Sequence, residues 1–216
     1  MVNKVLLLDT SVATLNIGDE IILDSIRENF PELFENNYIY SLPTHTLHFS
    51  LLQKLLYRKK IRAYSTADYK ILCGTNALYT NMLRPLPSWN INIFNSSLVK
   101  NTICLGVGIG LNSTSVNWYT RWLYSKVLSK KYIHSVRDEA AKIFLEKLGY
   151  QVYNTGCPTL WGMTSELCKR IPDSKSDSVV FTLTSYQADR TRDKAMVEIL
   201  SKITVIYIFG LKLSMI

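Results

Sequence analysis

Residues 133–150, IHSVRDEAAKIFLEKLGY, join an apolar strand pattern directly to an amphipathic helix pattern. Residues 132–136 are typical of a buried strand, and the acidic side chains of Asp138 and Glu139 favour a helix start, because they complement the helix dipole. Gly149 suits the end of that helix. The residues that share its apolar face are Ala140, Ile143, Phe144 and Leu148. A buried strand that runs into a helix is the unit of a parallel α/β sheet.

The same alternation extends along the chain. Strand patterns lie at 4–8, 37–41, 69–73, 102–107, 132–136 and 151–154, and helical patterns lie at 16–31, 46–58 and 115–129. After the polar, Pro-led stretch 172–178 the pattern restarts, with strands at 179–185 and 203–209 around a helix at 189–201. The sequence therefore predicts an α/β fold with a mainly parallel sheet. We expect a Rossmann-like N-terminal lobe over 1–172 and the incomplete start of a second lobe over 173–216.

Composition narrows the class of protein. Hydrophobic residues make up 47% and charged residues 19%, which excludes a disordered chain. The net charge of +8 points to anionic partners, namely phosphorylated metabolites, nucleic acid or an acidic membrane surface, or else only to a soluble surface. The chain has neither a dinucleotide nor a P-loop glycine motif, and its four cysteines and three histidines form no metal-ligand pattern. We expect no metal and no cofactor.

The apolar and basic stretches of the sequence indicate where in the cell the protein is found. No stretch approaches the ~18 apolar residues of a membrane-spanning helix, and residues 1–10 lack a signal-peptide core, so we expect a cytoplasmic protein. Two stretches, KLLYRKKIR at 54–62 and RWLYSKVLSKK at 121–131, mix basic with apolar and aromatic residues. They favour either peripheral contact with the inner face of a membrane or two solvated helix faces.

Polar residues follow the predicted strands, where parallel sheets bind their ligands. The turn at 16–20 offers the free N–H groups of a helix start to an anion or a sugar hydroxyl, or is an ordinary helix cap. The turn at 74–76 allows close ligand approach, or is only a tight turn. Arg137 could grip a phosphate or carboxylate, or form a surface ion pair. The candidate substrate-binding residues are Asn16, Gly18, Asp19, Gly74, Thr75, Asn76, Gly108, Arg137 and Asp138.

Two further residues have chemistry that we do not assign to a site. His134 lies within an apolar strand pattern, which is more typical of a core histidine than of a catalyst. Cys157 follows the sixth strand, but the sequence places no base beside it. The catalytic residue is therefore unassigned.

Five segments, in this order, resemble the polysaccharide pyruvyltransferase family. They are NIGDE at 16–20, DYKILCGTNAL at 68–78, ICLGVGIG at 103–110, IHSVRDEAAKIFLEKLGY at 133–150 and TGCPTLW at 155–161. The last departs from the family pattern, where many members carry Asp-Pro in place of Cys157-Pro158. The resemblance covers about residues 3–200, and its most specific part is the S-x-R-D block around Arg137.

The resemblance implies a two-lobed fold of the glycosyltransferase-B type. It also implies transfer of a pyruvyl group from phosphoenolpyruvate to sugar hydroxyls as a ketal, in exopolysaccharide biosynthesis, without a metal or nucleotide cofactor. The partners implied are phosphoenolpyruvate and a sugar or lipid-linked saccharide acceptor, and no nucleic acid. An Arg at position 137 would hold the anionic donor, and a His and an Arg of the second lobe would assist catalysis.

The chain also departs from the family. It carries one strand-helix-strand unit of the second lobe and no His after His134. We therefore expect a truncated member, inactive or incomplete as an enzyme, whose strands at 179–185 and 203–209 have few neighbours and promote self-association. The alternatives are a glycosyltransferase of the same fold that uses a nucleotide sugar, and a non-catalytic remnant.

Overall fold

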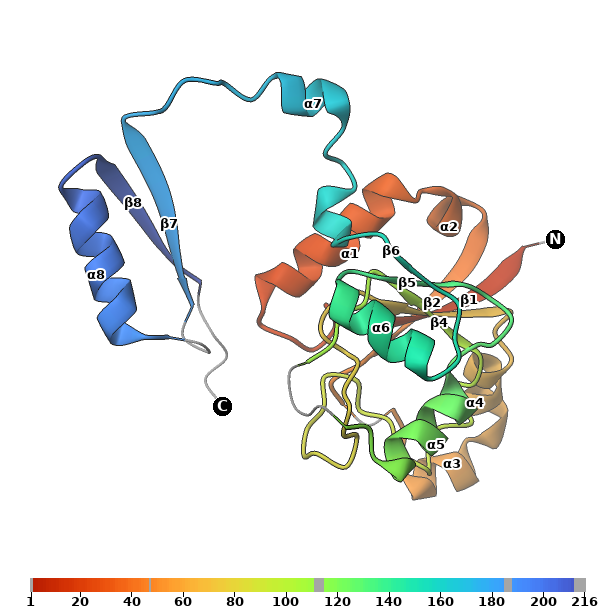
Figure 1. Ribbon diagram of the computed structural model, residues 1–216. Helices are drawn as coiled ribbons and strands as arrows, with labels where there is room; N and C mark the ends of the chain where they lie inside the picture. Colours follow the sequence, from red (N-terminus) through yellow and green to blue (C-terminus); the bar gives the residue numbers. More distant parts are fainter. Residues whose placement is uncertain (1, 47, 111–114, 185–187, 212–216) are drawn as a thin grey trace. The chain divides into compact units, whose positions relative to one another are not determined.

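A computed structural model describes residues 2–46, 48–110, 115–184 and 188–211. The chain divides into two compact units, Met1–Gly162 and Met163–Ile216, whose elements are labelled in Figure 1. The boundary expected after residue 172 falls inside the second of these units, and the assignment of two lobes stays a prediction. The first unit contains all of the candidate site residues.

The first unit is built on a parallel sheet with the strand order β2-β1-β3-β4 (Figure 1). Strands β5 and β6 pair in parallel with each other, and a bridge from Val107 to Val136 places β5 beside the residues that follow β4. The strands are β1 (Asn3–Asp9), β2 (Asn37–Pro43), β3 (Tyr69–Cys73), β4 (Thr102–Leu105), β5 (His134–Val136) and β6 (Val152–Asn154). This parallel α/β arrangement is Rossmann-like, as the sequence predicts.

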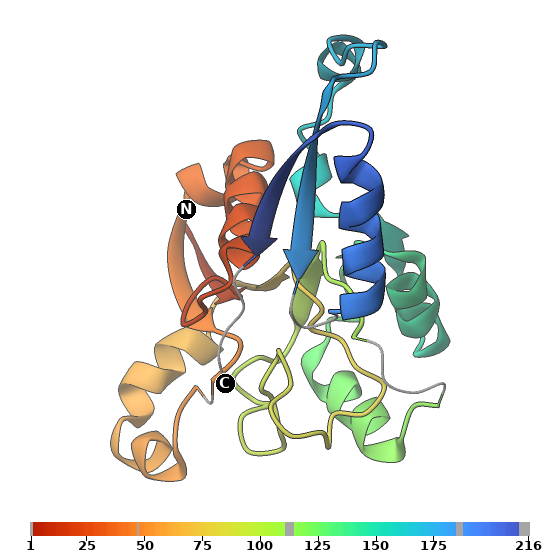
Figure 2. The same ribbon diagram turned by 90° about the vertical axis from the view of Figure 1, so that its left-hand side faces the viewer.

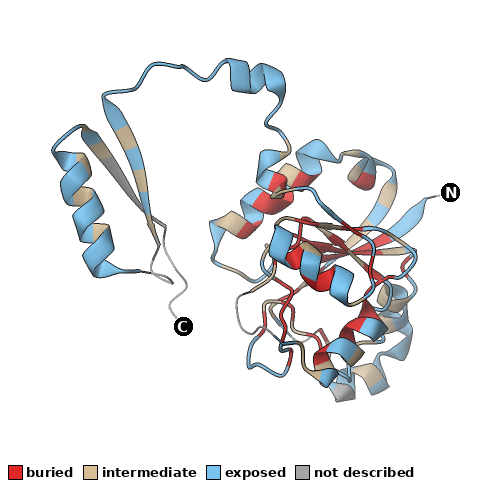
Figure 3. Cartoon of the chain, viewed as in Figure 1, coloured by how far each residue is buried: buried red, intermediate tan, exposed pale blue. Residues whose placement is uncertain are grey.

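Helices cover both faces of the sheet, because β1 is apolar on both faces. Leu6 and Leu8 point into a core with α5 and α6, whereas Val5 and Leu7 point to the opposite face and pack with α1. Figure 3 shows buried residues along the strands and on the helix faces turned toward them. The helices of this unit are α1 (Ile17–Asn29), α2 (Glu32–Glu35), α3 (Leu51–Leu56), α4 (Arg58–Ser65), α5 (Trp118–Val127), α6 (Glu139–Lys147) and the 3₁₀ turn η1 (Pro158–Leu160).

The strand-to-helix unit at 133–150 is confirmed, but its expected apolar face is wrong in part. Ala141, Phe144 and Leu145 are the buried residues of α6, whereas Ala140 and Ile143 are exposed, so the buried face is rotated by about one residue from the expected one. Asp138 is the N-cap of α6, and its carboxylate accepts a hydrogen bond from the Ala141 amide at 2.7 Å. Gly149 follows the last residues of the helix with φ of +85°, the left-handed conformation that ends many helices. The expected cap of α1 is also found, since the Asn16 side chain accepts from the Gly18 amide at 3.1 Å.

The helix expected at 46–58 is the clearest correction to the fold. Helix α3 begins only at Leu51, because Ser50 and Gln53 form a capping box in which each side chain accepts a hydrogen bond from the other's backbone amide. Helix α4 follows separately after Tyr57. The leucines expected to share one helix side include Leu47, which lies outside the described residues. Those described on α3, Leu52, Leu55 and Leu56, are exposed rather than packed.

The second unit contains α7 (Ser165–Lys169) and a strand-helix-strand segment made of β7 (Ser178–Thr184), α8 (Arg190–Ser201) and β8 (Val205–Leu211). Strands β7 and β8 pair in parallel as a two-stranded sheet. None of the residues whose burial is described in this unit is buried. In the described part of the whole chain, no helix has the length and apolarity needed to cross a bilayer.

Candidate functional site

The candidate residues near the start of α1 meet the loop that follows β3. Asp19, in the first turn of α1, is only 4% exposed. The Thr14 hydroxyl lies 3.4 Å from an oxygen of its carboxylate, and the Thr75 hydroxyl hydrogen-bonds the same carboxylate. Asn16 also hydrogen-bonds Asp19 through its side chain. The structure therefore brings Asn16, Asp19 and Thr75 together, although Thr75 is far from the other two in sequence.

A second group surrounds Arg137. One terminal nitrogen of its guanidinium donates to the Asn76 side-chain carbonyl at 2.5 Å. Gly108 lies against both side chains, because a Cβ added there would overlap Asn76 Oδ1 and lie 2.5 Å from Arg137 Nε and 3.0 Å from Asp138 Oδ2. Gly108 thus leaves the space in which the guanidinium sits.

The group around Asp19 and the group around Arg137 are joined through the backbone. The Gly108 amide donates to the Thr75 carbonyl at 2.7 Å, so the loop after β3 is bound to the segment after β4. Gly74 and Thr75 have φ of +60° and +50°. A left-handed conformation is uncommon for a β-branched residue such as Thr, and such strain is concentrated at functional sites. Every candidate residue therefore lies along one edge, at the carboxyl ends of the parallel strands, and substrate binding there stays a prediction.

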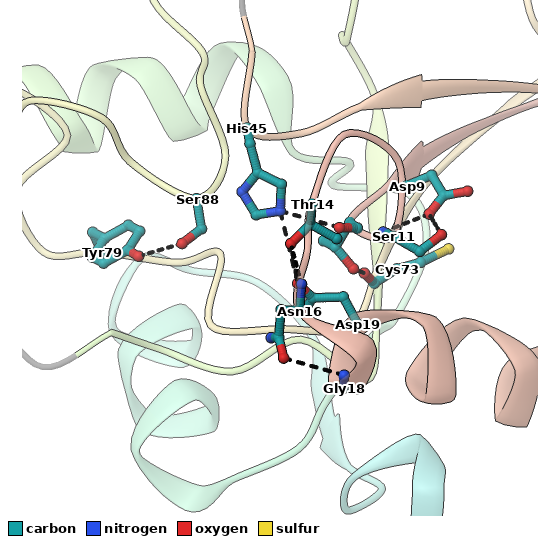
Figure 4. A network of polar contacts seen from close by, with 11 residues as sticks. Asp9, Ser11, Thr14, Asn16, Gly18, Asp19, His45, Cys73, Tyr79 and Ser88 are labelled. Carbon is teal, nitrogen blue, oxygen red and sulfur yellow. Dashed lines mark hydrogen bonds and ion pairs between the residues drawn. The ribbon is translucent and has the colours of Figure 1, made fainter. Parts of the chain in front are cut away.

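His45 is a residue of this edge that sequence reasoning missed. Its Nε2 lies 3.1 Å from the Thr10 carbonyl and 3.9 Å from Asp19 Oδ2. Figure 4 shows the His45 ring beside the start of α1. A carbonyl only accepts, so this nitrogen carries a hydrogen. His45 follows the carboxyl end of β2 by two residues. The same strand-end rule that selected the other candidates would have selected it.

Burial sets the electrostatics of Asp19. Removal from water raises the pKa of its carboxyl above the ordinary value of 3.8, because the charged form is poorly solvated. His45 and the hydrogen bonds from Thr75, Asn16 and Thr14 act in the opposite direction and lower that pKa by less. Asp19 therefore holds a proton more readily than an exposed aspartate does.

A small pocket opens in front of this cluster. It has a volume of about 250 Å³ and is lined by Ser11, Thr14, Leu15, Asn16, Ile17 and Glu20. One lining residue, Ser11, is held in place by Asp9, which is buried and accepts hydrogen bonds from the Ser11 amide at 2.8 Å and the Ser11 hydroxyl at 2.7 Å (Figure 4). Hydroxyl, amide and carboxylate groups around a space of this size suit a small polar ligand.

His134 is a core residue, as its sequence context suggests. It is fully buried, its Nδ1 accepts from the Cys104 amide at 3.1 Å, and its Nε2 contacts the Ser129 carbonyl at 2.8 Å and so carries the hydrogen. Burial lowers the pKa of His134, which favours the neutral ring. Among the residues that the structure describes, no group of three or more His, Cys, Asp or Glu side chains is arranged to hold a metal ion.

The parallel Rossmann-like sheet, with its polar strand ends gathered on one edge, defines an α/β protein of the type that binds ligands at the carboxyl ends of its strands. The family model described as polysaccharide pyruvyl transferase matches residues 16–210, and the chain belongs to that family. No curated protein and no solved structure matches the chain.

Proposed function

We propose that this edge is the donor site of a polysaccharide pyruvyltransferase-like protein, and that its donor is phosphoenolpyruvate. The observation that carries the proposal is the arrangement of Arg137, Asn76 and Gly108. A guanidinium has five N–H donors, and the bond to Asn76 uses one of them. The donors that remain suit the phosphate and the carboxylate of phosphoenolpyruvate, each of which can accept two parallel hydrogen bonds from arginine.

The reaction served by such a site forms a ketal. Two hydroxyls of the sugar add to C2 of the enolpyruvyl group, C3 takes up one proton to become a methyl group, and inorganic phosphate leaves with the second proton. Arg137 would stabilise the charge of the departing phosphate. Asp19 and His45 lie at the same edge and can hydrogen-bond a sugar hydroxyl or exchange a proton with it.

The acceptor in this proposal is a sugar or lipid-linked saccharide of an exopolysaccharide pathway. Phosphoenolpyruvate is made in the cytoplasm, so the proposal places the protein there. The two units would correspond to the lobes of a glycosyltransferase-B fold. Since the chain has no histidine after His134, we propose that it binds the donor but does not turn it over by itself.

Binding measurements with three anions test this proposal. Phosphoenolpyruvate, uridine diphosphate and inorganic phosphate are each titrated into the full chain by calorimetry. We expect saturable binding of phosphoenolpyruvate in the millimolar range, about 4 kcal/mol, and weaker binding of the other two. Tighter binding of uridine diphosphate would instead favour a nucleotide-sugar glycosyltransferase, and no binding of any anion would favour a non-catalytic remnant.

A further inference from the structure

A basic surface lies on the first unit, on helices away from the donor site. A pocket of about 560 Å³ is formed by α4, Lys54 of α3, and Ser97 with Leu98. A second pocket of about 460 Å³ shares Ser97 and continues the surface to α5. The charged residues that line the two pockets are Lys54, Arg58, Lys59, Arg62, Lys100 and Lys126. All are basic, and none of them takes part in an ion pair found among the described residues.

Exposed apolar side chains border this basic surface. Leu52, Leu55 and Leu56 stand three and four residues apart on α3, so they share one helix face, and they are 64%, 67% and 65% exposed. Ile93, which lines the second pocket, and Phe94 are also exposed. The Lys54 ammonium donates to the Phe94 carbonyl and thereby holds this loop against α3. At about 3.6 residues per turn, Lys54 lies on the side of α3 away from Leu52 and Leu56, so cations and leucines occupy different sides of the helix, as in an amphipathic helix at an interface. We call the exposed surface of α3, α4 and this loop the α3–α4 face.

The figures agree on this arrangement. In Figure 1 helices α3, α4 and α5 lie together at the lower side of the first unit. The turned view in Figure 2 shows α3 and α4 on one side of the loops between β3 and α5, with α5 on the other. Figure 3 shows α3 and α4 mostly exposed. The face therefore points away from the core.

We propose that the α3–α4 face docks the protein on an anionic lipid bilayer. Helix α3 lies in the plane of the interface with its three leucines toward the acyl chains, and the cations of α4 and the adjoining pockets contact lipid phosphates. Cations that take part in none of the ion pairs found among the described residues are free to bind an anionic surface. A solvated face would not need three exposed leucines at helical spacing, and a nucleic acid would leave them in water. This inference does not depend on the proposed donor.

Vesicle flotation with the full chain tests the proposal. Vesicles of phosphatidylcholine alone are compared with vesicles that also contain phosphatidylglycerol, at low and high salt. We expect binding to the anionic vesicles, weaker binding at high salt because the charges are screened, and little binding to the neutral ones. Equal binding to both vesicles, or none to either, would overturn the proposal.

Two triple variants separate the contributions of charge and apolar surface. We expect Arg58→Gln/Lys59→Gln/Arg62→Gln to weaken anionic binding by about a factor of five per residue. We expect Leu52→Ser/Leu55→Ser/Leu56→Ser to weaken it at least about tenfold, because the leucines no longer insert. All six side chains are exposed, so folding should persist, and circular dichroism checks this.

A matched control on α8 removes the same charge elsewhere. Arg190→Gln/Arg192→Gln/Lys194→Gln changes three exposed cations of the second unit and should leave vesicle binding close to that of the wild type. An equal loss in this control would show that only net charge matters and would overturn the docking face. Unchanged binding in the leucine variant would identify the face as a site for soluble polyanions instead of a membrane.

Discussion

The Asn76 side-chain carbonyl and the Arg137 guanidinium lie 2.5 Å apart, although one residue follows β3 and the other follows β5. The bond fixes the direction of the guanidinium at the edge where the strands end. Fixing a charged side chain before the ligand arrives lowers the entropy that binding must otherwise remove. The pairing of the strands therefore holds Asn76 and Arg137 together at the proposed donor site.

The position of the Arg137 guanidinium should require Gly108. The stability of the fold should depend on Gly108 much less. An alanine at 108 would overlap Asn76 Oδ1 and crowd Arg137 Nε, both ends of movable side chains. We expect Gly108→Ala to displace the guanidinium and weaken phosphoenolpyruvate binding several-fold, with a melting temperature near that of the wild type. The control is Gly162→Ala, where the nearest atom would be 3.7 Å away. Equal affinities in the two variants would contradict this role.

The buried carboxylate of Asp19 should lower the free energy of unfolding at neutral pH. Its pKa is raised in the folded state, so folding favours the protonated form. Stability from this group is fully present below pH 3.8 and is lost as pH rises through the folded pKa. We expect Asp19→Asn to be more stable than the wild type at pH 7, by on the order of 1 kcal/mol, with the difference shrinking toward pH 3.8. Denaturant unfolding at several pH values measures it. A variant that is less stable than the wild type at pH 7 would count against this.

His134 should show the opposite dependence on pH. Its pKa is lowered by burial, so the unfolded state binds more protons below the ordinary value of 6.5. Stability from the neutral ring is therefore present above pH 6.5 and is lost as pH falls through the folded pKa. Replacement by Ala leaves the Cys104 amide and the Ser129 carbonyl without this partner, and we expect a cost of about 2–5 kcal/mol at pH 7. The same unfolding measurement on His45→Ala, at the more exposed edge, should show a smaller cost.

The second unit should promote self-association. Val180 and Val205 are 63% and 57% exposed, and the β7–β8 register puts them on the same face of a two-stranded sheet. We expect concentration-dependent association in sedimentation velocity, reduced by Val180→Lys/Val205→Lys because charge on that face resists burial. The control, Val2→Lys/Ile143→Lys, changes two exposed apolar residues of the first unit. A monomeric wild type at all concentrations would refute the prediction.

Most of the regular elements were predictable because each depends on local pattern, although the helix expected at 46–58 was not. The run KVLLL at 4–8 is apolar on both faces and forms β1, one of the two inner strands of the sheet. Asp138 and Gly149 mark the two ends of α6, as their residue types indicate. The long connection between β3 and β4 was not predictable. It buries Trp89, Ile91 and Val99 without a helix or strand, and irregular backbone has no periodic signature.

The sequence predicted that most of the candidate residues lie at one edge of the sheet, but it missed His45 and did not predict the contacts among them. The carboxyl-end rule selects Gly74, Gly108 and Arg137 from sequence alone, because parallel strands end on the same side. It does not show that Asn76 orients Arg137 or that Thr75 reaches Asp19, since these are long-range side-chain contacts. The exposure of the α3 leucines could likewise not be predicted from the sequence, because helical spacing shows which residues share a face and does not show what covers that face.

The proposed donor site depends on the binding of phosphoenolpyruvate by Arg137. The most direct measurement titrates phosphoenolpyruvate into the wild type, Arg137→Ala and Arg121→Ala, by calorimetry or phosphorus NMR, with circular dichroism to confirm folding. Arg121 is an exposed arginine of α5 and controls for the loss of one positive charge. We predict millimolar binding to the wild type and to Arg121→Ala, and at least about a tenfold loss in Arg137→Ala. Unchanged affinity in Arg137→Ala, or an equal loss in Arg121→Ala, would contradict the account.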